Sequence, residues 1–184
     1  MRKLVLISLA VCLVAGGAFA QMAGEDKSKP LSPPASAECK FSNGKTVKIA
    51  YGSPRVRGRK IFALASEGAL VPYGEIWRTG ANAATTFVAD TNVTVGGTAV
   101  PAGNYTIFTV PKADSWILAI SKKTGEWGTN YPGEKEDLAR VPMSVSKTSG
   151  LVENFTIAFD QAGSKCTLRM EWENTRASIE VNAK

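Results

Sequence analysis

The amino-acid sequence predicts an all-β domain behind an export signal, and two observations carry the prediction of the fold class. From about residue 38 onward, short segments alternate apolar and polar side chains at a period of two, the spacing of a strand with one buried face. Glycine, proline, asparagine and aspartate separate these segments about every ten residues, whereas no segment keeps a helical period over three turns. A chain of 184 residues, 44% of them apolar, suits one core and one domain.

The first twenty residues have the pattern of a secretory signal peptide. Arg2 and Lys3 precede an apolar run that ends in small residues. We therefore predict cleavage after Ala20 and delivery to the periplasm or the cell exterior. The alternatives are a lipoprotein attached through Cys12 and an uncleaved anchor helix. The first fits less well because Val11 occupies a position where lipid modification requires a small residue.

Composition limits the possible partners. Residues 21–37 are rich in proline, serine and charge, which predicts a flexible leader before a single β-sandwich domain over residues 38–184. Signal removal leaves 20 basic and 16 acidic residues, a net charge of about +4. This modest excess, together with export, argues against a nucleic-acid partner. No membrane span is expected after cleavage.

The chain contains no histidine. This removes Ser-His and Cys-His nucleophile activation, imidazole acid-base catalysis and the commonest transition-metal ligand. We therefore predict no catalytic residue, no metal site and no cofactor, and we favour a protein that is not an enzyme.

The strands of the first two thirds follow in chain order. Ser42-Asn43-Gly44 predicts a hairpin turn between ECKF and TVKIAYG, because asparagine and glycine accept the positive φ of such turns. The segments TTFVAD, TNVTVGGTAV, PAGNYTIFTVP and WILAIS then read as strands with glycine and proline turns between them. Residues 61–70 and 134–140 are each expected to form a short helical turn.

The last third repeats the alternation in RVPMSVSK, NFTIAFD, KCTLRMEWEN and RASIEVN, which read as four strands. Phe155, Ile157 and Phe159 are expected to share the face that meets the core. Roughly nine or ten strands predict two antiparallel sheets packed face to face. The expected fold is a β-sandwich of jelly-roll or immunoglobulin-like type with at most one or two short helical turns.

Two cysteines remain after signal removal. Cys39 shares a strand face with Phe41, and Cys166 shares one with Leu168 and Met170, so both sulfurs are expected to point inward. In an oxidising compartment we predict a disulfide that joins the first strand to one of the last. Two buried free thiols are the alternative.

The segment VPYGEIWRTGAN carries the side chains from which anion and carbohydrate pockets are built. Trp77 offers a stacking face, Arg78 a bidentate fork for a carboxylate or phosphate, and Asn82 a paired donor and acceptor. Tyr73 and Thr79 complete this set of candidate ligand-binding residues.

A structural reading of the same segment is open. Trp77 then fills the core, Arg78 pairs with a buried carboxylate such as Glu171 or Glu173, and Asn82 satisfies the loop backbone. Under this reading the segment stabilises the fold and binds nothing.

Basic residues before this segment extend the candidate site. Arg59 and Lys60 are placed to join the pocket of the tryptophan-arginine loop. Arg55, Arg57 and Arg59 share one strand parity, which indicates either an anion-binding stripe or a solvated edge. Trp127, at an expected hairpin tip, is either an exposed sugar-stacking platform or a core residue.

The motifs YGSPRVRGRKIF, LVPYGEIWRTGANAATTF, VPAGNYTIFTVP, GEWGT and WENTR occur in this order. Together they resemble the bacterial family catalogued as domain of unknown function 2911, over about residues 38–182. The resemblance implies an exported, β-rich protein and transfers no catalytic or binding residue, because the family carries no established activity. Residues 61–70 depart from the family in being longer than its usual link.

These observations favour an exported, non-enzymatic protein that binds a small molecule, a glycan or an envelope partner through its tryptophan-arginine loop. A carboxylate-dependent hydrolase resembling a glycosidase is one alternative, with Glu171 and Glu173 as a candidate pair on one strand face. A structural or assembly module is the other, and it would present a flat apolar sheet face or edge.

Overall fold

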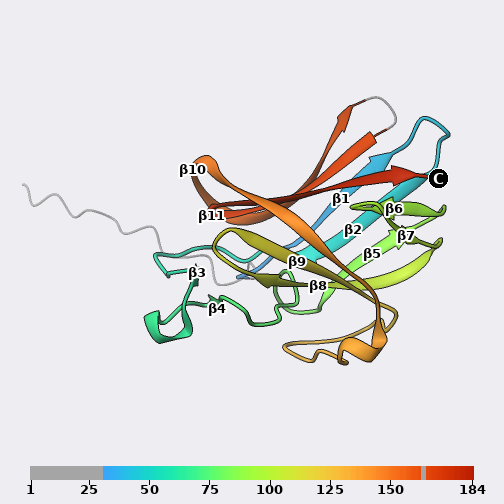
Figure 1. The fold of residues 1–184 in the computed structure, drawn as a ribbon. Helices are drawn as coiled ribbons and strands as arrows, with labels where there is room; N and C mark the ends of the chain where they lie inside the picture. The colour runs from blue at the N-terminus through green and yellow to red at the C-terminus, as the bar shows by residue number, and fades with distance from the viewer. Residues whose placement is uncertain (1–30, 163–164) are drawn as a thin grey trace, which may run out of the picture.

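The computed structural model describes residues 31–162 and 165–184 (Figure 1). Strands and turns make up nearly all of this part of the chain. The elements in chain order are β1 (Pro34–Lys40), β2 (Thr46–Gly52), β3 (Phe62–Ala63), the 3₁₀ helix η1 (Ala65–Glu67), β4 (Val71–Pro72), β5 (Thr85–Ala89), β6 (Val93–Val95), β7 (Thr98–Val100), β8 (Gly103–Pro111), β9 (Ser115–Ser121), the 3₁₀ helix η2 (Glu134–Glu136), β10 (Asp137–Ala162) and β11 (Lys165–Ala183).

The all-β class is confirmed, and the two 3₁₀ helices lie within the segments predicted as helical turns. Nine strands form one antiparallel sheet in the order β1-β2-β5-β8-β9-β10-β11-β6-β7. β3 and β4 form a separate parallel pair. Packing as a sandwich of two sheets is not confirmed, because β10 and β11 carry the hydrogen bonding continuously from one half of the fold to the other.

β10 and β11 form a long hairpin that bends back over the sheet (Figure 1). The register between the two strands shifts on both sides of Val152, opposite Glu173, whose φ is 54°. Bulged pairings of this kind bend strands and increase their twist. The four strands expected in the last third are therefore two, since pairing resumes beyond each irregularity.

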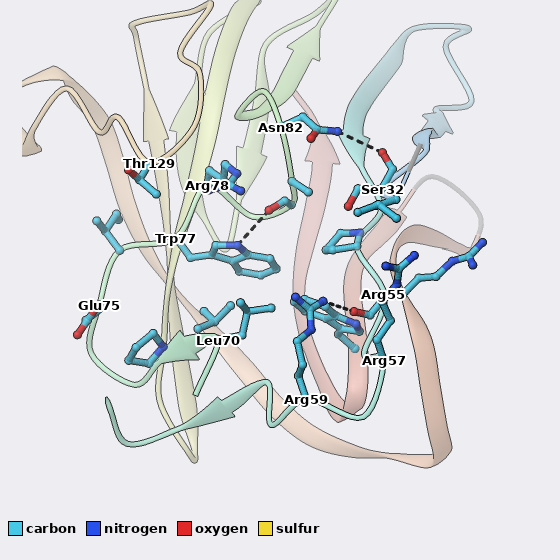
Figure 2. A pocket seen from close by; sticks show the side chains of 18 residues that line it. Ser32, Arg55, Arg57, Arg59, Leu70, Glu75, Trp77, Arg78, Asn82 and Thr129 are labelled. Carbon is cyan, nitrogen blue, oxygen red and sulfur yellow. Dashed lines mark hydrogen bonds between the residues drawn. The ribbon is translucent and has the colours of Figure 1, made fainter. Parts of the chain in front are cut away.

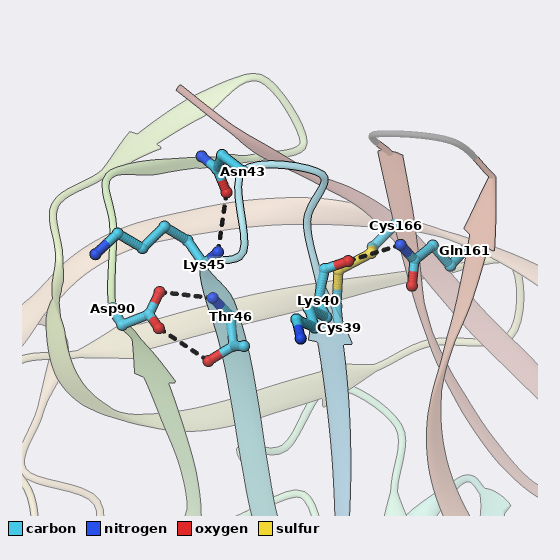
Figure 3. The surroundings of a disulfide bond; sticks show 8 residues. All are labelled: Cys39, Lys40, Asn43, Lys45, Thr46, Asp90, Gln161 and Cys166. Carbon is cyan, nitrogen blue, oxygen red and sulfur yellow. Dashed lines mark hydrogen bonds between the residues drawn. A yellow bond between two sulfur atoms is a disulfide. The ribbon is translucent and has the colours of Figure 1, made fainter.

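The far half of this hairpin is tied to the first strand. The disulfide between Cys39 of β1 and Cys166 of β11 is confirmed, with Cα atoms 6.4 Å apart. Beside it, Gln161 Nε2 donates a hydrogen bond of 2.6 Å to the carbonyl oxygen of Lys40 (Figure 3). The disulfide thus links elements from opposite ends of the domain and helps the curved sheet enclose its core.

β1 starts earlier than the sequence predicts. It begins at Pro34, within the range assigned to the flexible leader, and pairs Ala35 with Tyr51 and Ala37 with Ile49. Small side chains gave no strand signal there, because the strand is specified by its partner rather than by its own pattern. The predicted signal peptide and its cleavage site lie outside the described residues. Within the described ranges, no helix has the length and apolarity needed to span a membrane.

An aromatic cluster fills the core at the end where the candidate loop lies. The indoles of Trp77 and Trp172 stack with centroids 5.8 Å apart and an interplanar angle of 18°, and Phe155 meets Trp77 edge to face. Phe155 and Ile157 are buried as expected, whereas Phe159 is only partly buried. The loop that carries the candidate ligand-binding residues is therefore anchored in the core by its tryptophan.

Candidate functional site

A cavity of about 770 Å³ opens beside the tryptophan-arginine loop. Arg55, Arg57 and Arg59 reach it from the segment that follows β2, and Arg78 reaches it from the loop that follows β4 (Figure 2). We call this cavity the arginine pocket. Trp77 contributes to the wall of the pocket, but it is 9% exposed and its indole stacks on Trp172, so it fills the core as the structural reading expects. The side chains of Arg55 and Arg57 lie on the opposite side of the pocket from this indole (Figure 2).

The structure separates the predicted site residues into two groups. Those that line the arginine pocket are Arg59, Trp77, Arg78 and Asn82. Tyr73 packs against the core, and Thr79 is fully buried. Lys60 lies outside the pocket and forms an exposed ion pair of 2.8 Å with Glu67 of η1. The binding role of the first group stays a prediction that the geometry makes possible.

Hydrogen bonds on both sides fix the backbone of Arg78. The amide nitrogens of Trp77 and Thr109 each donate to the other residue's carbonyl oxygen at 2.8 Å. On the other side, the hydroxyl of Thr85 donates to the carbonyl oxygen of Thr79 at 2.7 Å. Because both neighbours of Arg78 are held, the starting direction of its side chain is set before any ligand arrives.

Two glycines allow the loop to lie directly on the end of β2. A Cβ atom on Gly52 would lie 2.3 Å from the carbonyl oxygen of Ala81, and one on Gly80 would lie 3.0 Å from that of Gly52. Thr79 and Asn82 adopt positive φ values of 56° and 64°. Non-glycine residues seldom occupy this region, and where they do the surrounding structure must hold them there.

Arg78 is a partly buried cation without an anionic partner among the described residues. Its Nε–H group is buried and donates a hydrogen bond to no acceptor in that part of the chain. Burial lowers the pKa of Arg78, yet a guanidinium stays protonated in proteins. The pairing with Glu171 proposed by the structural reading is absent, since Glu171 accepts hydrogen bonds from Arg169 and Arg176 instead.

The other arginines keep the pocket cationic. The side chain of Arg59 is held by two backbone carbonyl oxygens, donating from Nε to Val56 at 3.1 Å and from Nη2 to Arg55 at 2.5 Å. These neutral acceptors leave its positive charge uncompensated. Glu75 is the one carboxylate among the residues that line the pocket, against four guanidinium groups.

The carboxylates of the hydrolase hypothesis do not meet in this pocket. Neither Glu171 nor Glu173 is among its lining residues. Glu171 is 8% exposed and forms ion pairs with the guanidinium groups of Arg169 and Arg176. Among the residues that line the arginine pocket, Glu75 has no second carboxylate to form the pair that a glycosidase requires.

A second, smaller hollow of about 310 Å³ adjoins the arginine pocket and shares Ser32, Ala81 and Asn82 with it. We call it the Trp127 hollow. The side chain of Trp127 is 69% exposed and lines it. The loop of Trp127 is fastened to the candidate loop, because the amide of Gly128 donates to the carbonyl oxygen of Asn82 at 3.1 Å. Trp127 is therefore not a core residue.

Residues 32–181 match the family described as Protein of unknown function (DUF2911). The chain belongs to this family. The match confirms the resemblance carried by WRTGAN and the other motifs, and it begins near the start of β1 rather than at residue 38. No curated protein and no solved structure matches the chain.

Some of the pocket of this DUF2911 protein was visible in its sequence and some was not. Arg55, Arg57 and Arg59 all line the arginine pocket, but they do not form the extended stripe that their parity suggested, because Arg57 lies in a turn with a φ of 50°. Ser32 and Thr129 carried no signal, because they reach the pocket from segments far away in the sequence.

Proposed function

We propose that this DUF2911 protein binds a small molecule that carries a carboxylate, phosphate or sulfate group, and that it does so in the arginine pocket after export. The observation that carries the proposal is the partly buried guanidinium of Arg78, which faces a cavity with three further arginines and has no anionic partner among the described residues. An anion bound there would supply the missing charge and the missing hydrogen-bond acceptor.

The proposed pocket combines one partly buried cation with three exposed ones. Hydrogen bonds at Trp77 and Thr79 hold the backbone of Arg78, so little backbone conformational entropy is lost when its guanidinium binds an anion. Arg55, Arg57 and Arg59 are exposed and supply long-range attraction, which salt would screen. The Cys39–Cys166 disulfide suits an oxidising compartment, which supports action outside the cytoplasm.

Citrate, sulfate and inorganic phosphate are suitable probes, each titrated calorimetrically into the purified domain in a buffer free of multivalent anions. We expect at least one of them to bind and to raise the unfolding temperature. Arg78→Gln should weaken that binding about tenfold to a hundredfold, since a hydrogen bond to a charged group contributes roughly 1.5 to 3 kcal/mol. Higher salt should weaken binding to the wild-type protein.

Lys112→Gln is the matched control, because it removes one exposed positive charge outside the pocket. It should change the dissociation constant less than about twofold. Arg55→Gln provides a second pocket variant in which an exposed side chain changes and the fold is not at risk. If no anion binds, or if Arg78→Gln and Lys112→Gln behave alike, the proposed function is wrong.

A further inference from the structure

We infer that the anion of the arginine pocket is an acidic saccharide, whose carboxylate lies among the arginines and whose neighbouring pyranose ring stacks on Trp127. This inference rests on the proposed function, because it assigns a chemical class to the molecule that the arginines would recognise. It is carried by the Trp127 hollow, which the charge argument does not use.

Trp127 is exposed in a way that core packing does not explain. Its side chain is 69% exposed, whereas those of Trp77, Trp116 and Trp172 are 9%, 1% and 1% exposed. The backbone behind it is fixed, because Trp127 pairs with Ala83 in an isolated antiparallel bridge and Gly128 is held by the neighbouring loop. A rigidly presented, uncovered indole is a common means of stacking a ring-shaped ligand.

The surface beside Trp127 leaves room for a flat ring to lie against the indole. Small residues dominate it, including Ala50, Gly52, Ala83 and Ala84. With so few atoms projecting from this surface, a six-membered ring can lie against the indole, placing its C–H groups on the negative π face.

One ligand can reach both regions. The Trp127 hollow and the arginine pocket share Ser32, Ala81 and Asn82, so the two regions adjoin. At this border the side-chain amide of Asn82 donates a hydrogen bond of 3.2 Å to the carbonyl oxygen of Ser32 (Figure 2). Thr129 lines the arginine pocket from the same loop that presents Trp127. A disaccharide that follows this shared border would place one ring on the indole and its acidic neighbour among the guanidinium groups.

Polar side chains of the two regions favour a hydroxyl-rich ligand. Ser32 and Thr129 offer hydroxyl groups that both donate and accept. Asn82 offers its amide oxygen, because its Nδ2 atom donates to the carbonyl oxygen of Ser32, and the hydroxyl oxygen of Thr86 can accept in the Trp127 hollow, since this hydroxyl donates to Ala50. The carboxylate of Glu75 can accept hydrogen bonds from sugar hydroxyls. A simple aliphatic acid would leave Trp127 uncovered.

Calorimetric titration with digalacturonic acid and with citrate tests the inference. Trp127→Ala should weaken the binding of digalacturonic acid about threefold to tenfold, the range expected for one stacking contact, and leave the affinity for citrate unchanged. Leu151→Ala, which removes another exposed apolar side chain outside both regions, should affect neither probe. Trp127→Phe should restore part of the loss, because it keeps an aromatic face.

Fluorescence provides an independent readout. Trp127 is the one strongly exposed tryptophan among the four, so acrylamide should quench mainly its emission. Digalacturonic acid should protect this emission in the wild-type protein, and citrate should not. Protection by both probes would contradict ring stacking on Trp127.

The outcomes separate the two proposals. If citrate binds but digalacturonic acid binds wild type and Trp127→Ala equally, the assignment of an acidic saccharide is wrong and the proposal of anion binding stands. If adenosine monophosphate depends on Trp127 and binds more tightly than digalacturonic acid, the ligand is a nucleotide and the saccharide is again wrong. If neither acid binds but sulfate or phosphate does, the saccharide assignment is wrong and anion binding stands, whereas both proposals fail if no anion binds.

Discussion

Breaking the Cys39–Cys166 disulfide is the perturbation whose effect the structure predicts most directly. The bond joins residues 127 positions apart, and it connects β1 with β11. Closing a loop of this length lowers the entropy of the unfolded chain, which corresponds to about 5 kcal/mol of stability at 25 °C. Since small domains are stable by roughly 5 to 15 kcal/mol, the reduced protein should be marginal or unfolded in buffer.

Urea unfolding followed by circular dichroism measures this difference. The oxidised and reduced forms of the wild-type protein have the same heavy atoms and differ only in the sulfur-sulfur bond and the two thiol hydrogens, so their comparison isolates the cross-link. With a slope of about 2 kcal/mol per molar urea, the reduced form should unfold at a midpoint about 2 to 3 M lower. The double variant Cys39→Ala, Cys166→Ala should lose roughly 1 to 2 kcal/mol more, because both sulfurs are buried.

A small effect would refute the reasoning. If reduction lowers the midpoint by less than about 0.5 M urea, the unfolded chain is already restricted or other contacts hold β1 in place. The hydrogen bond from Gln161 to Lys40 is one such contact. Reduction at concentrations of urea that leave the fold intact should not change anion affinity, since neither cysteine lines the arginine pocket.

Two further predictions concern the loop support and the response to pH. Gly52→Ala should destabilise the protein and weaken citrate binding, because its Cβ would lie 2.3 Å from a backbone oxygen under the candidate loop. Gly150→Ala, with nothing within 4 Å, should do neither, and equal thermal shifts for the two variants would contradict the close-approach argument. Burial and the hydrogen bond that Tyr131 donates to Asp137 raise the pKa of Tyr131 above 10.0. The folded state therefore retains the phenol proton that the unfolded chain releases, so this stabilisation is complete below pH 10 and declines as the pH rises toward the folded-state pKa. Unfolding free energies of wild type and Tyr131→Phe, compared from pH 8 upward, should show the steeper decline in wild type, and parallel curves would contradict it.

Local patterns in the sequence were sufficient for the strand faces. Val47 and Ile49 are buried as their alternation requires, and Gly44 takes the positive φ of 80° that the hairpin turn demands. Cys39 and Cys166 were placed inward by the same parity and are 1% and 0% exposed. These features follow from the two-residue repeat of an extended chain, which is a property of neighbouring residues.

The long-range pairing was decided only by the tertiary structure. The alternation in the last third does not reveal that pairing resumes past Val152, so the two continuous strands β10 and β11 were read as four. The start of β1 at Pro34 depends on its partner in β2 in the same way. Register and sheet membership are interactions between distant segments, and a local period does not encode them.

For the candidate site as well, residue types could be read from the sequence and their spatial arrangement could not. Residue types alone identified Trp77, Arg78 and Asn82 as candidates for binding, and the density of positive charge drew attention to the three arginines that follow β2. Only the tertiary structure shows that these two sets face one cavity, because β2 and the loop after β4 meet at Gly52. It also shows that Glu171 pairs with Arg176 and not with Arg78. The sequence thus determined which side chains could recognise an anion, whereas the fold decided which of them lie together, because charges act through space and not along the chain.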